Sequence, residues 1–132
     1  MATAAAPTKS QVTKAGKTLR KAFSSLNHVF LADEVLAAYQ VLTAFRAAHA
    51  SPMQAANMGL RSRLRTEECP IEVSQRLKRI PTIIDKLVRE PTMALGNMGD
   101  IGGVRAVVGS IDEVRRTAVR IQKGRPIAQY HD

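Results

Sequence analysis

Hydrophobic residues recur with a helical period through the first half of the chain. The spacing predicts a short basic helix over about 11–21, whose apolar side carries Val12, Ala15 and Leu19. Asp33 can cap a second helix to about residue 50, with one face formed by Leu31, Val35, Leu42 and Phe45. Ser51 and Pro52 suit the N-cap and first position of a third helix, which continues with Met53, Ala56, Leu60 and Leu64. We therefore expect residues 11–66 to be helical, after a disordered lead over 1–10.

The period changes in the second half of the chain. Apolar and polar residues alternate over 72–79, which predicts a strand, and Pro81 opens a helix to about Arg89. A β-rich run over 101–108 precedes Ser110 and Glu113, which form a capping box sequence. The helix behind it ends at Gly124, and its expected inward face carries Ile111, Val114, Ala118 and Ile121. With a third strand over 127–131, the pattern predicts a single α+β (α/β-like) domain over 11–132. Its N-terminal helices are followed by a mixed sheet with flanking helices over 71–132.

Charge adds a preference for anionic partners to this picture. The 132 residues carry a net charge of +9, and residues 1–66 hold nine Lys and Arg against two Asp and Glu. Such a chain suits nucleotide phosphates, nucleic acid, ribosomes or membrane surfaces. Three Phe, two Tyr and no Trp argue against base stacking on single-stranded RNA. One cysteine excludes an internal disulfide framework and a multi-cysteine zinc site, and Cys69 is expected to fill a small apolar space.

Four residues around the first strand and its helix form a candidate phosphate site. Arg76 and Lys78 are two residues apart, so their side chains leave the strand on the same face. Thr82 and Lys86 are four residues apart and share one face of the next helix. Free N–H groups at a helix N-terminus favour phosphate. The four residues therefore suit a triphosphate, and a solvated basic strand face is the alternative on spacing alone.

Asp100 and Arg105 are the other candidates. A carboxylate beside bound phosphates can hold Mg²⁺, although an isolated Asp more often caps a turn. Arg105 can stack its guanidinium plane on a base. Strict alternation places the two side chains on opposite faces, and a bulge at Gly102 and Gly103 would bring them to one side.

Two segments resemble a known enzyme family. Residues 76–87, Arg-Leu-Lys-Arg-Ile-Pro-Thr-Ile-Ile-Asp-Lys-Leu, are similar to the R-x-K-x-x-x-S-I-x-x-K stretch of the RelA/SpoT family of (p)ppGpp synthetases. Residues 100–107, Asp-Ile-Gly-Gly-Val-Arg-Ala-Val, resemble that family's D-I-x-G-x-R strand, and the spacing between the blocks also fits. The resemblance is clear over about 71–123 and fainter over the N-terminal helices. It implies a nucleotidyltransferase-like synthetase fold, incomplete at the C-terminus.

The resemblance also implies a reaction and residue roles. The family transfers pyrophosphate from ATP to the 3′-hydroxyl of GTP or GDP in the stringent response. Arg76 and Arg105 would sandwich the adenine. The ATP phosphates would be held by Lys78, Thr82 and Lys86, with Thr82 in place of the usual Ser. Asp100 would be the catalytic residue that coordinates the Mg²⁺ cofactor.

The chain departs from the family pattern near its end. The family continues into a lysine-rich loop, a G-Y-R-x-x-H block whose Tyr stacks the acceptor guanine, and a second acidic residue. Residues 129–132, Gln-Tyr-His-Asp, do not substitute for that block. We therefore expect the donor half of the site without the acceptor half, and a chain that alone is inactive.

Two alternatives stay open beside the synthetase. One is a non-catalytic nucleotide- or partner-binding remnant of the family. The other is a basic nucleic-acid or ribosome-binding module, which the charge of residues 1–66 favours and the few aromatic residues disfavour. The sequence shows no apolar segment of about 20 residues and no signal peptide, so we expect a cytoplasmic protein with no membrane or DNA partner. It leaves a homo-oligomer open.

Overall fold

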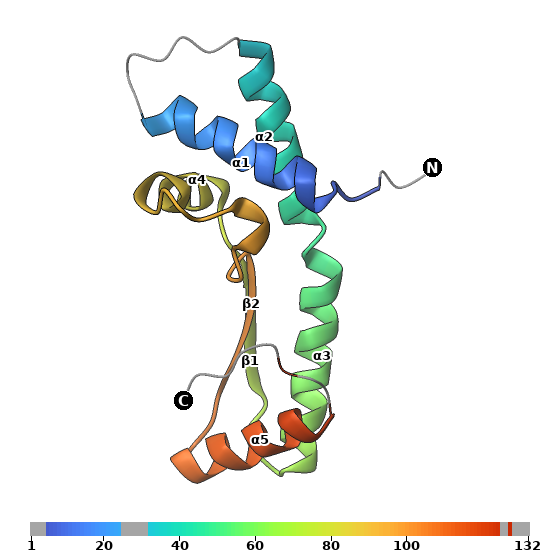
Figure 1. The fold of residues 1–132 in the computed structure, drawn as a ribbon. Coiled ribbons are helices and arrows are strands. Elements are labelled where there is room, and N and C mark those ends of the chain that lie inside the picture. The colour runs from blue at the N-terminus through green and yellow to red at the C-terminus, as the bar shows by residue number, and fades with distance from the viewer. Residues whose placement is uncertain (1–4, 25–31, 125–126, 128–132) are drawn as a thin grey trace. The chain divides into compact units, whose positions relative to one another are not determined.

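The computed structural model describes residues 5–24, 32–124 and 127 (Figure 1). Their elements follow the order α1 (Lys9–Ser24), α2 (Ala32–Ala47), α3 (Ala50–Thr66), β1 (Glu72–Leu77), α4 (Ile80–Arg89), the 3₁₀ helix η1 (Leu95–Asn97), β2 (Gly102–Val107) and α5 (Ile111–Gly124). The two strands pair in one antiparallel sheet. The predicted α+β class is therefore confirmed. The predicted third strand over 127–131 lies, except for Ile127, outside the described residues.

The chain divides into two compact units. The first unit comprises Met1–Ser51 and Leu77–Gly103, and the second comprises Pro52–Arg76 and Val104–Asp132. The first unit thus holds α1, α2, α4 and η1, whereas the second holds most of α3, most of both strands, and α5.

The hydrophobic core of the first unit lies where α1 packs against α2, α4 and η1 (Figure 1). The predicted apolar side of α1 is confirmed, because Val12, Ala15 and Leu19 are all buried. They join residues from the other three helices and their connections, namely Ala38, Leu42, Ile83, Ile84, Leu87, Leu95, Met98 and Ile101. Burial of this apolar surface is what holds the four helices together.

Two further contacts fix α1 within this unit. Gly16 lies so close to η1 that a Cβ built on it would stand 2.7 Å from the Leu95 Cβ, so only glycine allows the approach. The Arg20 guanidinium donates to the carbonyls of Leu87 (2.6 Å), Glu90 (3.3 Å) and Met93. These carbonyls lie at and beyond the end of α4, where helices leave carbonyl groups without intrahelical partners.

The second unit begins with α3, which ends in a Schellman motif. Cys69 N–H donates to Leu64 O (2.9 Å) and Glu68 N–H to Arg65 O (3.1 Å). Leu64 and Cys69 are both buried, which supplies the apolar contact typical of this motif and confirms the predicted place of the thiol. Glu68 occupies the left-handed position with φ 54°, where glycine is usual. The tight turn leads the chain directly into β1.

The capping box of α5 is confirmed. The predicted inward face of this helix is wrong at Ile111 and Val114, whereas Ala118 and Ile121 are half-buried. Glu113 N–H donates to Ser110 Oγ (3.2 Å), and the Glu113 carboxylate accepts from Gly109 N–H (2.7 Å). Ile111 and Val114 are 70% and 52% exposed, and the buried residue of α5 is Thr117, whose hydroxyl lies 3.9 Å from Cys69 Sγ. The helix therefore contacts the second unit through a face rotated from its most apolar one.

Several boundaries differ from the predicted ones. Helix α1 begins at Lys9, two residues inside the expected lead, because Thr8 and Gln11 form a reciprocal capping box: Thr8 N–H donates to Gln11 Oε1 (2.8 Å) and Gln11 N–H to Thr8 Oγ1 (3.2 Å). Helix α3 begins at Ala50, so Ser51 lies inside its first turn rather than at the N-cap.

Among the helices of the described residues, none has the length and apolar character needed to cross a membrane.

Candidate functional site

The connection between β1 and α4 lies beside the segment that leads into β2. Lys78 N–H donates to Ile101 O at 2.7 Å, which pairs the residue after β1 with the residue before β2. Asp100 and Lys78 are thereby brought side by side, although 22 residues separate them in the sequence. The strand ends thus place two of the predicted site residues together in the first unit.

Lys78, Lys86 and Asp100 form the lysine–aspartate cluster. Lys78 Nζ lies 2.6 Å from Asp100 Oδ2, and Lys86 Nζ lies 3.2 Å from the same oxygen. The two lysine side chains are 14% and 19% exposed, whereas that of Asp100 is 52% exposed. Both ammonium groups therefore lie within hydrogen-bond distance of the same oxygen of a half-exposed carboxylate. Two cations can hold a single phosphate oxygen in the same way.

The cluster lowers the pKa of the Asp100 carboxyl below its usual range. The hydrogen bond from Lys78 is the main cause, and the bond from Lys86 and the charges of both lysines act in the same direction. Partial desolvation opposes them. Asp100 is therefore ionised at neutral pH, and its charge is shared between the two lysines.

Thr82 lies in the first turn of α4, where the backbone N–H groups have no intrahelical acceptor. Arg79 is the N-cap of this helix, with an extended backbone (φ −70°, ψ 145°) and no hydrogen bond from its side chain to the cap. The helix N-terminus, the Thr82 hydroxyl and the lysine–aspartate cluster thus belong to the same unit. Dipole and cations both favour a negatively charged group in this part of the unit.

Arg46 is a site residue that the sequence did not reveal. It lies in the last turn of α2, and its Nε donates to Lys78 O at 2.8 Å. The Lys78 backbone is therefore held on both sides, by Arg46 at its carbonyl and by Ile101 at its amide. Arg46 is therefore a positioning residue. It lies 32 residues before Lys78, and the sequence predicted only the helix that contains it.

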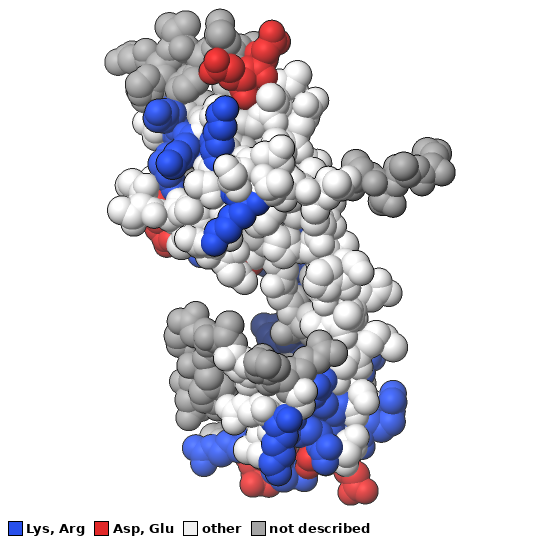
Figure 2. Space-filling view, turned by 45° about the vertical axis from the view of Figure 1, so that its right-hand side comes forward, with Lys and Arg blue, Asp and Glu red and all other residues white. Residues whose placement is uncertain are grey.

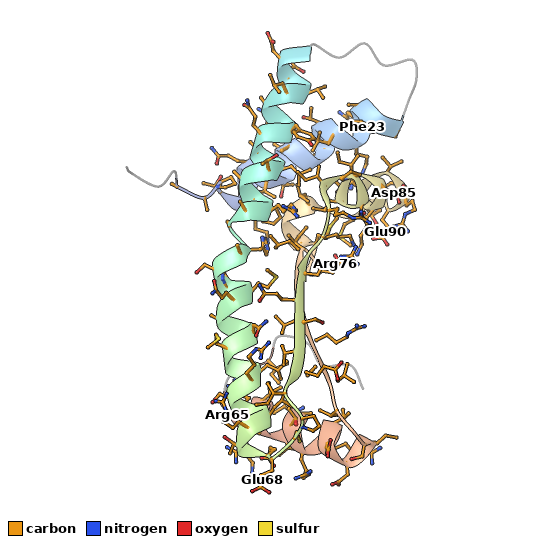
Figure 3. All side chains as sticks on the ribbon, turned by 180° about the vertical axis from the view of Figure 1, so that it is seen from behind. Phe23, Arg65, Glu68, Arg76, Asp85 and Glu90 are labelled. Atoms are coloured by element: carbon orange, nitrogen blue, oxygen red, sulfur yellow. The ribbon has the colours of Figure 1, made fainter. Side chains whose placement is uncertain are left out.

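Arg76 and Arg105 lie in the second unit, on β1 and β2 respectively. Figure 3 labels Arg76. Continuing the antiparallel register from Lys78 and Ile101 places Ser74 opposite Arg105, which makes Arg76 a diagonal neighbour of Arg105 on one exposed face. Diagonal Cβ atoms are roughly 7 to 8 Å apart. A flat ring in van der Waals contact with a plane on each side needs about 7 Å.

Strand β2 has no sign of a bulge at Gly102 and Gly103. Burial alternates without interruption from Gly102 to Val107, and neither glycine has a positive φ. Arg105 is therefore placed by regular strand geometry, and Asp100 lies before the strand rather than within it.

The Asp100 carboxylate has the chemistry of the Mg²⁺ ligand that the family resemblance implies. Its carboxylate is a hard oxygen donor, half-exposed and ionised. Within the described residues, no three His, Cys, Asp or Glu side chains gather closely enough to hold a metal ion by themselves. A Mg²⁺ ion at Asp100 would thus depend on phosphate oxygens for its other ligands, which is the usual way proteins bind it.

Comparison with known proteins found no match: no protein-family model and no curated protein matches the chain. The family resemblance therefore rests on the sequence of residues 76–87 and 100–107 alone.

Proposed function

We propose that the chain is the ATP-binding part of a (p)ppGpp synthetase, which transfers pyrophosphate from ATP to the 3′-hydroxyl of GTP or GDP. The observation that carries the proposal is the lysine–aspartate cluster. Three residues that the family motifs assign to phosphate and Mg²⁺ meet at one oxygen, with distances of 2.6 and 3.2 Å. A solvated basic face would leave these lysines apart from each other and exposed.

Each residue has a defined part in this proposal. Lys78 and Lys86 bind phosphate oxygens of ATP, and Thr82 adds a hydroxyl at the start of α4. Bound Mg²⁺ supplies positive charge against the charge that develops on the phosphates. Asp100 orients that ion, and the family resemblance assigns the adenine to Arg76 and Arg105. The proposal includes a cytoplasmic location, where ATP and GTP are present.

Binding of ATP tests the donor site, and two single substitutions on α4 form a matched pair. Lys86→Gln and Arg89→Gln each remove one positive charge, but Arg89 pairs with the exposed Asp85, labelled in Figure 3, and not with Asp100. By calorimetry with Mg²⁺, we expect Lys86→Gln to weaken ATP binding about tenfold, the loss of one charge-assisted hydrogen bond, and Arg89→Gln by less than about twofold. Equal effects of the two would contradict the phosphate site.

A second ligand separates the phosphate contacts from the adenine contacts. Arg105→Ala should weaken ATP binding by about tenfold to a hundredfold, the magnitude of stacking on one base. It should leave binding of inorganic tripolyphosphate unchanged, because tripolyphosphate has no ring. Lys86→Gln should weaken both ligands. An Arg105→Ala variant that binds ATP as the wild type does would remove Arg105 from the adenine site.

The reaction itself separates a synthetase from a non-catalytic relative. Purified protein is incubated with radiolabelled ATP, GTP and Mg²⁺, and the products are separated by thin-layer chromatography. The chain alone is expected to give no product. A (p)ppGpp product that forms when a second polypeptide carrying the G-Y-R block is added, and that disappears in Asp100→Ala, supports the synthetase. Intact ATP binding with no product in either mixture supports the nucleotide-binding alternative.

A further inference from the structure

A second basic site lies in the second unit, between the end of α3 and α5. Its cavity has a volume of about 450 Å³, which is within the range of small-molecule sites. None of the six residues assigned to ATP and Mg²⁺ lines it. The cavity is therefore a separate site from the lysine–aspartate cluster.

Four cations line this cavity against a single carboxylate, Glu67. The cations are Arg63 from α3 and, from α5, Arg116, Arg120 and Lys123. Glu67 accepts from Arg120 Nε at 2.7 Å and lies 3.8 Å from Arg116 Nη1. In the parts of the chain that the structure describes, Arg63 and Lys123 form no ion pair with a carboxylate. Figure 2 shows Lys and Arg side chains gathered around this end of the unit.

The Arg63 guanidinium lies against two glycines in the cavity wall. A Cβ built on Gly59 would stand 2.9 Å from Arg63 Nη1, and one built on Gly124 would stand 3.0 Å from Nη2. The guanidinium thus lies between two glycines, one on each helix, in space that any side chain would fill. Ser62 and Thr66 line the same wall, and the Thr66 hydroxyl donates to Ser62 O at 3.0 Å. The cavity is therefore rich in hydrogen-bond donors.

We infer that this cavity binds a small polyphosphate anion, such as the phosphates of a nucleoside polyphosphate. Guanidinium groups match phosphate oxygens in pairs, and four cations around one carboxylate leave the cavity with an excess of positive charge. Glu67 orients Arg120 through the 2.7 Å contact, whereas Arg116 pairs more closely with Asp112, at 3.3 Å, than with Glu67. This site is separate from the proposed ATP site and does not depend on the proposed function.

A single-stranded RNA fits the cavity less well than a small anion. RNA-binding grooves combine phosphate contacts with aromatic side chains on which bases stack. The described residues of the second unit include no Phe, Tyr or Trp. The cavity therefore offers phosphate recognition without base recognition, which is the chemistry of a small polyphosphate site.

Two double variants of the full chain test this site. Arg63→Gln with Lys123→Gln removes two charges from the cavity, one on each helix. Arg65→Gln with Arg115→Gln removes two exposed charges from the same helices outside its lining, and Figure 3 labels Arg65. Tripolyphosphate binding is followed by amide chemical shifts in NMR spectra at about 0.15 M salt. Gly59 and Gly124 report on the cavity, and Thr82 reports on the proposed ATP site.

We expect tripolyphosphate to shift the Gly59 and Gly124 signals of the wild type. The cavity double variant should weaken this binding at least about tenfold, and the exposed double variant by less than about threefold. Equal weakening by both variants would show general charge attraction and overturn the proposal, as would unshifted Gly59 and Gly124 signals in the wild type. Shifts at Thr82 test the ATP site separately.

A third variant covers the case in which the cavity double variant does not fold. Val119→Glu adds a carboxylate to the lining at a position that is 48% exposed, and it leaves every arginine in place. It should also weaken tripolyphosphate binding at least about tenfold, whereas unchanged binding overturns the proposal. A short RNA that shifts Gly59 and Gly124 where tripolyphosphate does not would replace the small-anion site by an RNA site.

Discussion

Asp100 combines two properties that are rarely found in one surface carboxylate. It receives hydrogen bonds from two ammonium groups that are themselves largely buried, yet half of its own side chain is exposed. The lysines lose hydration and gain one shared counter-charge, so the carboxylate holds them together against their mutual repulsion. In the proposed ATP site, a phosphate bound at these lysines would replace Asp100 there and would leave its carboxylate for the cation that accompanies the phosphate.

The shared carboxylate makes part of the stability depend on pH. The pKa of Asp100 is lower in the folded chain than its unfolded value near 3.9, mainly through the bond from Lys78. The folded chain thus binds fewer protons, and the contribution is fully present above about pH 4 and is lost as pH falls through the folded pKa. We expect the free energy of unfolding to fall more between pH 6 and pH 3 in the wild type than in Asp100→Asn. Half of the Asp100 side chain is exposed, so the difference is at most about 1 kcal/mol.

Urea unfolding at several pH values measures this difference, and Asp85→Asn is the matched control. Asp85 is 64% exposed and pairs with Arg89, which is 60% exposed. The control should follow the wild type through the whole range. A pH dependence of Asp100→Asn equal to that of the wild type would mean that the cluster opens in solution.

Spacing left a solvated basic face as an alternative, and the family resemblance was needed to single out Lys78, Lys86 and Asp100. Neither could show that Asp100 pairs with both lysines in the absence of phosphate. Arg46 was missed for a different reason. It acts through a backbone carbonyl 32 residues away, and any residue can supply a carbonyl, so neither partner carries a signal in the sequence.

The end of α3 decides where Glu67, and with it two arginines of the cavity, is placed. The Schellman motif needs a left-handed residue after the helix, and the chain supplies Glu68 with φ 54°. A residue with a Cβ pays roughly 1 kcal/mol or more for this conformation, and glycine does not. The turn is therefore a strained joint in an otherwise regular helix end.

Replacing Glu68 with glycine should relieve that strain. Glu68→Gly is expected to raise the free energy of unfolding by about 0.5–1 kcal/mol, because relief of strain exceeds the added freedom of the unfolded chain. Glu68→Ala removes the same exposed charge and keeps the Cβ, so it should give no such gain. Chemical denaturation of both variants measures the effect. Equal stabilities would show that charge rather than backbone conformation governs this turn.

The helices were predictable as elements, since period and caps are local. The signal for the first helix start was present, because Thr8 and Gln11 have capping-box spacing, although it lies inside the expected lead. The face of α5 was not predictable. A period shows which side chains share a face, but whether Ile111 and Val114 are covered depends on surfaces far away in the sequence.

The two units differ greatly in how much apolar surface they bury. All eleven residues of the main hydrophobic cluster belong to the first unit. In the second unit, the buried residues among those described are Leu64, Cys69 and Thr117, and its short two-stranded sheet segment leaves Val107 48% exposed. A sheet of two strands is only marginally stable unless an apolar face is well covered. The hydrophobic contribution to stability is thus concentrated in the first unit.

This asymmetry predicts two levels of protection against amide hydrogen exchange. In native conditions, amides of α1 and α4 should exchange at least about tenfold more slowly than amides of α5, because α5 can open without exposing the main core. Hydrogen exchange followed by mass spectrometry measures both regions in one sample. If the cavity binds tripolyphosphate, saturating tripolyphosphate should slow exchange in α5 through binding to the folded form, and the Arg63→Gln, Lys123→Gln double variant should lose that effect. Equal protection of α1, α4 and α5 would instead show that the chain opens as one cooperative unit, in which Leu64, Cys69 and Thr117 are as well protected as the main core.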